Sequence, residues 1–340
     1  MTMTLQTRIE QTPDAFGIPA WGALMAKDPN ASIFTTPEWH RLWWEEFSVG
    51  KDLFVLTMTR DDEIVAIVPL YRKEDAGRKV LRFVGGIDLT DYLGPICAAE
   101  ARLYVADALV DWLLSTDVEW DEFDAHNMPV PFGFAEFLVE RADHAELSFA
   151  LDQEETSAIL KLPSDWDSYL ASLNSKERHE LKRKQRRIER EHPDAAVRAS
   201  TPETLDADLE VFVDMHRGTD GLKGHFMRRD IATFFERVAR AFSELGWLRL
   251  DFLEIGGTAI ATTFGFEHGN TLYLYNSAFE PEAKRLSPGL ILVAALIQEA
   301  VKKGTETFDL LRGRERYKYQ LGAEAVPLNN LRVFRPGVAN

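Results

Sequence analysis

The sequence predicts an α/β (α+β) protein of two tandem domains, each with a mixed, largely antiparallel sheet flanked by helices. Three observations support this prediction. Apolar, β-rich runs alternate with helical stretches in both halves of the chain. A length of 340 residues favours two domains over one. Each half also has two apolar strands joined by a short turn, Asp61-Asp62 in the first and Gly256-Gly257 in the second, which suggests a duplication.

The composition narrows the classes of function. The chain has 55 acidic and 39 basic side chains and a net charge of -16, which on average repels nucleic acid and anionic membranes. No run of eighteen apolar residues and no apolar leader is present, so we expect neither a membrane span nor a signal peptide, and a cytoplasmic location. The single cysteine, Cys97, excludes an internal disulfide and argues against a cysteine-based metal site. The oligomeric state is not readable from these features.

The first half, residues 1–150, begins its regular structure with a helix start at Thr36-Pro37, an N-cap followed by proline at the first helical position. Strands are then expected at 53–59, 64–71, 80–84 and 92–97, and a helix is expected at 101–114. This succession predicts an α/β or α+β domain that ends near residue 150.

The second half, residues 151–340, opens with an expected strand at 157–162 and one long helical region from 166 to about 191. Another helix is expected at 234–245, where Gly246 ends it. An antiparallel meander follows, with strands expected at 247–255, 259–266 and 271–278.

The last strand of this meander places Tyr273, Tyr275 and Ser277 on one face if its side chains alternate regularly. An apolar helix then runs from Pro288 to about Lys303, and a short strand follows at 307–311. The meander therefore leads into a strand-helix-strand unit.

An ordered set of short motifs identifies the relatives of this second half. They are Trp247-Leu248-Arg249-Leu250, Tyr273-Leu274-Tyr275, Leu286-Ser287-Pro288-Gly289, Phe308-Asp309-Leu310-Leu311-Arg312-Gly313 and Tyr317-Lys318. In order and spacing they resemble the GNAT-like acyltransferases of the CelD (cellulose-biosynthesis) type, which are related to the FemABX peptidyltransferases. The resemblance covers about residues 160–335, and in the first half only the general layout matches.

The resemblance implies two tandem GNAT-like domains and an acyl-CoA donor such as acetyl-CoA. In the resembled fold the strand with Tyr275, Asn276 and Ser277 splays from its neighbour, and the gap receives the pantetheine arm and the acyl carbonyl. The resemblance also implies that Lys318 stabilises the oxyanion of acyl transfer, a contribution of a few kcal/mol to the barrier. The alternative is a solvated lysine in a charged segment.

The residues themselves support a phosphate site at the start of the apolar helix. Ser287, Pro288 and Gly289 leave backbone N–H groups unpaired in the first turn, and Lys284 and Arg285 lie just upstream. The complete glycine-rich loop of a standard GNAT enzyme is absent. An ordinary helix start with proline at its first position is the alternative.

Polar residues after the short strand are the candidate catalysts. Asp309 can orient or deprotonate an amine, Arg312 can bind substrate, and Tyr317 precedes the candidate Lys318. An equally open interpretation is that Asp309 forms a structural ion pair with Arg312 or Arg314.

A basic helix is expected between Lys176 and Glu191, with a net charge of +4. Its exposed rows, which include Arg178 and Lys182, suit the phosphates of CoA, of a nucleotide-linked sugar or of tRNA. The resemblance singles out Arg178. The alternative is a solvated helix face.

A glycine-rich segment at 215–226 carries His216 and His225 and suits a loop that closes over a substrate. His216 is a candidate general base because imidazole titrates near neutral pH. Since no third ligand pattern accompanies the two histidines, we expect no metal. Both histidines being ordinary polar loop residues is the alternative.

Three hypotheses about function follow. The first is an N-acyltransferase that moves an acyl group from acyl-CoA to a small-molecule or sugar-linked amine; a sugar or cell-envelope/polysaccharide precursor is implied by the resemblance alone. The second is a FemABX-like transferase that uses aminoacyl-tRNA, although no heptad run long enough for a tRNA-binding arm is present. The third is a catalytically silent GNAT-like binding component of polysaccharide assembly.

Overall fold

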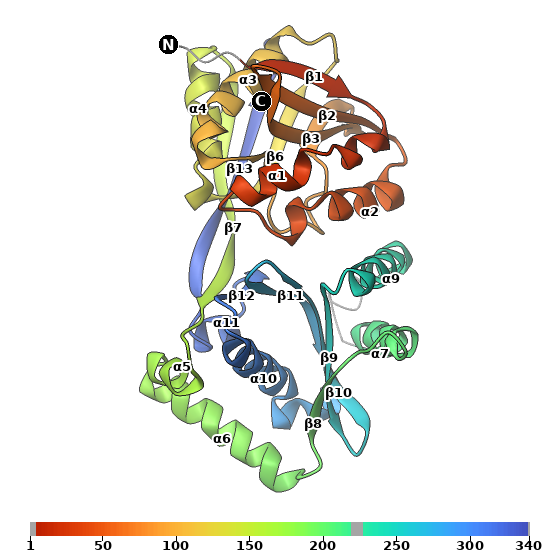
Figure 1. Ribbon diagram of the computed structural model, residues 1–340, viewed down its shortest axis with the longest axis vertical. Coiled ribbons are helices and arrows are strands. Elements are labelled where there is room, and N and C mark those ends of the chain that lie inside the picture. Colours follow the sequence, from red (N-terminus) through yellow and green to blue (C-terminus); the bar gives the residue numbers. More distant parts are fainter. Residues whose placement is uncertain (1–4, 219–226, 339–340) are drawn as a thin grey trace. The chain divides into compact units, whose positions relative to one another are not determined.

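The computed structural model describes residues 5–218 and 227–338 (Figure 1). The chain forms two compact units: unit 1 contains the residues up to Thr156 together with those from Val326 onward, and unit 2 contains Ser157–Ala325. Within the described residues, no helix combines the length and the apolar character needed to cross a bilayer.

Unit 1 is built on a sheet with the strand order β1-β2-β3-β4-β6-β13, and β5 pairs with β3. Neighbouring strands are antiparallel except β4 and β6, which are parallel. Its elements are β1 (Gln6–Glu10), η1 (Pro13–Gly17), α1 (Trp21–Lys27), η2 (Ile33–Thr35), α2 (Pro37–Phe47), β2 (Lys51–Arg60), β3 (Glu63–Asp75), β4 (Arg78–Phe83), β5 (Ile96–Cys97), η3 (Ala99–Ala101), α3 (Arg102–Ser115), β6 (Glu122–Pro129), η4 (Val130–Phe132), α4 (Phe134–His144) and β13 (Glu324–Phe334). The strand β7 (Ser148–Lys161) leads from unit 1 into unit 2.

The core of unit 1 lies between its sheet and the helices α3 and α4. Val105 and Leu109 of α3 pack with Leu138 of α4, Phe123 of β6 and Leu331 of β13, and all five are fully buried. The predicted helix start is confirmed, because the Thr36 side chain accepts a hydrogen bond from the backbone N–H of Trp39. Of the stretch predicted as extended at 92–97, only Ile96–Cys97 forms a strand.

Unit 2 has the strand order β7-β12-β11-β10-β9-β8. Its elements are α5 (Trp166–Ser172), α6 (Ser175–Glu191), β8 (Ala196–Ala199), α7 (Leu205–Arg217), α9 (Arg229–Glu244), β9 (Leu248–Ile255), β10 (Thr258–His268), β11 (Thr271–Phe279), η5 (Pro281–Leu286), α10 (Pro288–Lys303), β12 (Thr307–Arg312) and α11 (Arg316–Gln320). The helices α5, α6 and α10 lie on one side of this sheet, and α7 and α9 lie on the other (Figure 1).

The long helical region predicted from 166 to 191 is two helices. Asn174 separates α5 from α6 because its side chain accepts a hydrogen bond from the Glu177 backbone N–H at 3.0 Å and so caps α6. Leu173, between the helices, remains buried in the core with Leu181 and Ile188. The predicted apolar seam is therefore present, although the helix is interrupted.

The two units repeat the same order of elements. In unit 1, β2, β3, β4, α3 and β6 form a meander followed by a helix and a parallel strand, and β9, β10, β11, α10 and β12 do so in unit 2. The turns also match, since Asp61, Asp62, Gly256 and Gly257 all have positive φ, as tight hairpin turns require. These likenesses support the duplication suggested by the sequence.

The observed units differ from the predicted ranges of 1–150 and 151–340 in the place of the C-terminal strand, which belongs to unit 1. Antiparallel pairing from Leu328↔Pro129 to Phe334↔Glu122 joins β13 to β6, so residues from Val326 onward belong to unit 1. In unit 2 the corresponding place beside β12 is taken by residues Ser157–Lys161 of β7.

Candidate functional site

The strands β11 and β12 separate after a short parallel contact. They pair from Thr271↔Thr307 to Tyr273↔Asp309. Beyond Asp309, β12 bulges, and Leu311 has a φ of 58°, a backbone conformation that costs energy for a branched side chain. Buried Asp309 stabilises this conformation by accepting a hydrogen bond from the Leu311 N–H at 2.8 Å. Asp309 thus shapes the end of β12.

A second bulge changes the direction of the side chains on β11. Gly265 of β10 pairs with Leu274, but Phe264 pairs with Asn276, which leaves Tyr275 as the extra residue. Ser277 therefore points to the α10 side of the sheet and Asn276 to the α7 side, so the expectation that Tyr273, Tyr275 and Ser277 share one face is wrong. A Cβ atom on Gly265 would lie 2.2 Å from the Tyr273 carbonyl oxygen, so the bulge requires glycine there.

A pocket of about 440 Å³ lies at the separated end of these strands, on the α10 side. It is lined by the end of β11, by η5, by the first turns of α10 and by the segment after β12. The lining residues are Ser277, Ala278, Phe279, Lys284, Ser287, Pro288, Gly289, Leu290, Val293, Glu315 and Tyr317.

The start of α10 forms one wall of the pocket. Ser287 is the N-cap residue, with φ 57° and ψ 47°, and its side chain makes no capping hydrogen bond. Pro288 has no N–H, and the first-turn N–H groups of Gly289 and Leu290 have no partner within the helix. Together with the helix dipole and Lys284 they make this wall suitable for an anion.

Tyr317 forms another wall and is hydrogen-bonded to the Ser277 side chain. Burial raises the pKa of the Tyr317 phenol, the charge of Glu315 raises it further, and the hydrogen bond to Ser277 only partly opposes these effects. The phenol is therefore protonated at neutral pH and can serve as a proton donor.

Lys318 lies behind this wall and is 3% exposed. Its ammonium nitrogen is 2.6 Å from the Arg312 carbonyl oxygen and 3.3 Å from that of Leu311, and 3.0 Å from the Glu315 carboxylate. These acceptors match the three N–H donors of an ammonium group. Lys318 therefore holds the end of β12 and the Glu315 side chain in place.

Glu315 is a pocket residue that the sequence did not single out. Its carboxylate packs so closely on Gly313 that a Cβ atom there would lie 2.2 Å from the Glu315 oxygen. The only sequence signal was its position three residues before Lys318, a spacing that brings two side chains together on a helix.

His216 and Tyr275 lie on the other side of the sheet from the pocket. The His216 ring nitrogens are each 2.9 Å from an oxygen, Nδ1 from the Phe212 carbonyl and Nε2 from the Asn276 side chain. The same Asn276 oxygen accepts the Ser277 backbone N–H at 2.8 Å. His216 thus fixes Asn276 beneath the site. The predicted loop partner His225 lies outside the described residues.

The predicted phosphate-binding arginines have structural partners. Arg178 donates to the carbonyl oxygens of Leu170 and Leu173, at 3.2 and 3.3 Å, and so caps the end of α5. Arg285 pairs with Glu191 at 2.6 Å. Arg178, Arg285, the exposed Lys182 and Arg312 are outside the lining of the pocket.

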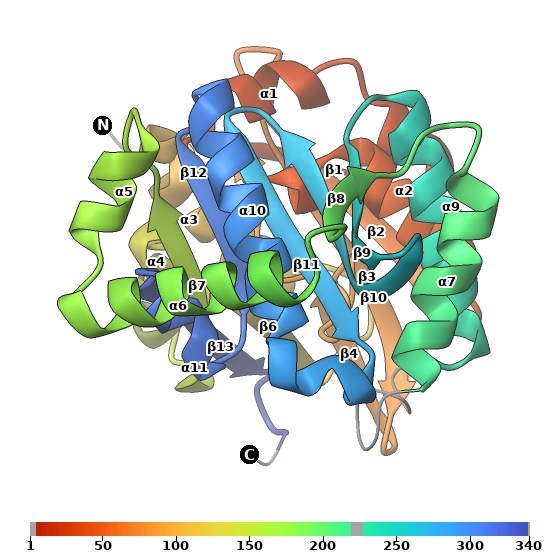
Figure 2. The same ribbon diagram turned by 90° about the horizontal axis from the view of Figure 1, so that it is seen from below.

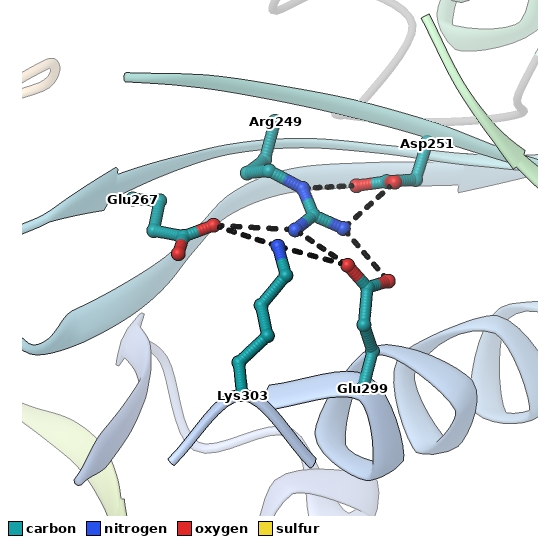
Figure 3. A network of polar contacts seen from close by, with 5 residues as sticks. All are labelled: Arg249, Asp251, Glu267, Glu299 and Lys303. Atoms are coloured by element: carbon teal, nitrogen blue, oxygen red, sulfur yellow. Dashed lines mark hydrogen bonds and ion pairs between the residues drawn. The ribbon is translucent and has the colours of Figure 1, made fainter. Parts of the chain in front are cut away.

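Five charged side chains fix the far half of α10 to β9 and β10 (Figure 3). Arg249 contacts Asp251 at 3.1 Å and Glu299 at 3.0 Å, and Lys303 contacts Glu299 at 3.0 Å and Glu267 at 3.3 Å. Burial would lower the pKa of Arg249, but Asp251 and Glu299 outweigh it and raise the pKa. Arg249 therefore remains charged and anchors the helix whose start forms the pocket.

The corresponding helix start in unit 1 is closed. Arg102, the first residue of α3, forms a buried ion pair with Asp28 at 2.8 Å and lies 4.0 Å from the centre of the Phe132 ring. Among residues 5–218 and 227–338, no group of three or more His, Cys, Asp or Glu side chains is arranged to hold a metal ion. The candidate chemistry is concentrated in unit 2.

Residues 175–319 match the family model described as an acetyltransferase (GNAT) domain. The chain therefore has a GNAT-superfamily, FemABX-like fold. Solved structures agree: FemX, at 13% identity and a TM-score of 0.66, is matched over 95% of this chain and 96% of its own length. A search of curated protein sequences gives no match.

Two further structures share the GNAT-superfamily fold. A tandem GNAT protein from the clavulanic acid biosynthesis pathway has 13% identity, a TM-score of 0.50 and coverage of 99% of this chain and 100% of that one. A C-terminal domain assigned to a lysylphosphatidylglycerol synthetase of Agrobacterium fabrum has 12% identity, a TM-score of 0.58 and coverage of 95% and 92%. At these identities the likeness concerns the fold.

Proposed function

We propose that unit 2 is an N-acyltransferase that moves an acyl group from acyl-CoA, such as acetyl-CoA, to an amine. The observation that carries the proposal is the pocket beside the end of β11, where β11 has separated from β12, with the N–H groups of Gly289 and Leu290 that have no partner within α10 in its wall. In this proposal the pantetheine arm enters the pocket. A phosphate of the donor lies at Gly289 and Leu290 with Lys284 beside it.

Direct transfer accounts for the polar groups of the pocket. The amine nitrogen attacks the thioester carbonyl, the C–N bond forms and the C–S bond breaks. Tyr317 protonates the leaving thiolate, and Glu315 receives the proton that the amine loses. General acid or base catalysis of this kind contributes about 10²- to 10⁴-fold to a rate.

In this proposal the other predicted catalytic residues do not line the pocket but hold the chain around it. Asp309 shapes the end of β12, His216 fixes Asn276, and Lys318 holds Glu315. A direct role of Lys318 at the oxyanion would require its ammonium to exchange the longer bond, to the Leu311 carbonyl, for the thioester oxygen.

Calorimetry with acetyl-CoA and longer acyl-CoAs tests the donor site. We expect binding by the wild-type protein and by Gly289→Ala, because a Cβ atom at Gly289 would meet Phe279 at an ordinary 3.6 Å. Gly289→Trp places an indole in the pocket and should abolish binding. Absence of acyl-CoA binding by the wild type, or unchanged binding by Gly289→Trp, would refute the site.

The acceptor in our proposal is an amine on a sugar or cell-envelope precursor, following the CelD-like resemblance. Aminoacyl-tRNA is the alternative donor, and the observation that favours it is the exposed basic face of α6. Filter binding with charged tRNA at increasing salt separates the two donors, because phosphate contacts give a steep salt dependence.

A further inference from the structure

The exposed side of α6 carries a row of basic residues that the proposed reaction leaves unused. The helix buries Leu181 and Ile188 in the core of unit 2. On the opposite side, residues three, four or seven apart share one face, and most of the side chains on this face are basic and exposed, with Ser175, Glu180 and Glu189 beside them. This basic row consists of Lys176, His179, Lys182, Arg183, Arg186 and Arg190. It spans about 21 Å at 1.5 Å per residue.

Much of the charge of the basic row is available to a partner. Arg183 pairs with Glu180 at 2.6 Å and Arg190 with Glu191 at 3.2 Å. Lys176, Lys182 and Arg186 have no ion-pair partner in the part of the chain that the structure describes. In a chain of net charge -16, this row is a local surface that attracts anions.

The C-terminal end of α6, where the basic row ends, lies against η5 beside the pocket. Arg187 of α6 donates to the Arg285 carbonyl oxygen at 3.0 Å, and Glu191 pairs with the Arg285 side chain. Arg285 belongs to η5, whose Lys284 lines the pocket. Figure 2 shows α6 crossing α10, whose first turns form the pocket wall. A macromolecule bound along the row would therefore stand beside the pocket.

We infer that the basic row docks an acidic carrier-protein domain, which presents its acyl group to the pocket on a phosphopantetheine arm. The inference rests on the proposed acyl transfer and names a macromolecular donor for it. The arm carries one phosphate, and the pocket wall offers one compact anion site at Gly289, Leu290 and Lys284. The carrier's acidic surface complements the row.

Two features favour a small acidic protein over RNA. The net charge of -16 repels a polyanion that extends beyond the row, whereas a small domain contacts only the local surface. In addition, α6 contains no phenylalanine, tyrosine or tryptophan, the large aromatic side chains on which an unpaired base stacks best. In the transfer, the carrier thioester C–S bond breaks as the C–N bond forms, and the carrier thiol leaves with a proton.

The test compares donors and charge variants in binding assays that need no acceptor. A bacterial acyl carrier protein loaded with an octanoyl group and octanoyl-CoA are the probes. The row variant, Lys182→Glu with Arg186→Glu, reverses two charges of the basic row. The control variant, Arg229→Glu with Lys302→Glu, changes the net charge by the same amount at two exposed cations elsewhere. We expect the row variant to bind the loaded carrier at least about tenfold more weakly, the control within about twofold of wild type, and octanoyl-CoA to bind all three proteins alike.

Equal carrier affinity in the wild type and the row variant, or an equal loss in the control variant, overturns the inference. So does charged tRNA that binds through the row while the carrier does not bind. If octanoyl-CoA binds the pocket and the loaded carrier does not bind, the inference fails and the proposed acyltransferase stands. If neither thioester binds, both fail.

Discussion

Tyr317 of α11 lines the pocket and is hydrogen-bonded to Ser277 of β11, and burial raises the pKa of its phenol. If this phenol protonates the leaving thiolate, Tyr317→Phe should lower kcat about 10- to 100-fold and leave the KM for the acyl donor nearly unchanged. Steady-state kinetics with a thiol-detecting reagent measures both constants.

Ser277→Ala is the matched control for this prediction, because it removes the hydrogen-bond partner of Tyr317 and keeps the phenol. Its loss of kcat should be smaller than that of Tyr317→Phe. Full activity of Tyr317→Phe would show that the proton comes from another group.

Substitutions of Lys318 can separate a structural role from a direct catalytic role of this residue. Lys318→Ala leaves two carbonyl oxygens and Glu315 without their buried cation, so we expect a loss of about 3 kcal/mol in unfolding free energy. Urea denaturation measures this loss. Lys318→Arg should restore part of the stability. If Lys318→Arg restores kcat to the same extent as stability, Lys318 acts by positioning its neighbours. If it restores stability but not kcat, Lys318 has a direct role at the oxyanion.

Some of the residues singled out from the sequence lie together at one pocket, and these are near a recognisable backbone feature. Ser277, Ser287, Gly289 and Tyr317 do line one pocket. Tyr275 does not, because it stacks on Phe235 of α9 on the other face of the sheet, whereas the extra residue moves Ser277, which follows it, to the pocket face. A bulge of this kind leaves no periodic signal in the sequence, and Glu315 was missed because a lone carboxylate among charged neighbours is uninformative.

At the scale of the elements, the β10–β11 bulge depends on Gly265. Gly265→Ala would put its Cβ atom 2.2 Å from the Tyr273 carbonyl oxygen, so one strand must shift. We expect a loss of about 2–3 kcal/mol in unfolding free energy and weaker acyl-CoA binding, since the bulge directs Ser277 to the pocket. Denaturant titration and calorimetry measure the two effects. Gly289→Ala is the control, and equal stability of the two variants would contradict the prediction.

The anchoring of α10 makes the stability of unit 2 depend on pH. Burial would raise the pKa of Glu299, but Arg249 and Lys303 outweigh it and lower the pKa. A carboxyl group with a lowered folded-state pKa stabilises the fold above its unfolded pKa, and this contribution is lost as the pH falls through the folded pKa. Glu299→Gln should therefore cost about 1 kcal/mol at pH 7 and nothing in strong acid.

Urea denaturation at several pH values checks this prediction, with exposed Glu306→Gln as the control. Asp251 contributes with the opposite sign, because burial raises its pKa and only part of that effect is offset by Arg249. Its contribution declines as the pH rises through its unfolded pKa towards the folded one. A cost of Glu299→Gln that is the same at every pH would show that the ion pairs do not anchor α10.

Elements with strong local signals were predicted well. The helix from Pro288 to Lys303 begins at proline and ends before Gly304, which has a φ of 77°, as helix-terminal preferences require. By contrast, β13 was missed. Its sequence contains a proline and two asparagines, residues depleted in strands, and pairing with β6 determines its structure instead.

At the scale of the whole molecule, the repeat of the two units could be predicted from the sequence, but the path of the chain between them could not. Turns and strand order repeat locally and were suggested by the sequence. The return of the C-terminal strand to unit 1 depends on a pairing between residues about 200 apart in the chain, which local patterns do not encode. Unit 2 is consequently one continuous segment, and unit 1 is not.

This difference predicts how fragments of the chain behave. Residues 157–325 contain every strand segment that pairs with β12, β11, β10 and β9 within unit 2, so this fragment should fold and bind acyl-CoA. Residues 1–156 lack β13, whose Leu331 and Val333 are at most 1% exposed in the core of unit 1. Without them β6 loses a partner and the core loses two large side chains, each contributing about 2–3 kcal/mol.

Proton NMR spectra should show dispersed signals for residues 157–325 and not for 1–156, and adding a peptide of residues 324–340 should restore folding. A folded 1–156 fragment would show that β13 is dispensable to unit 1.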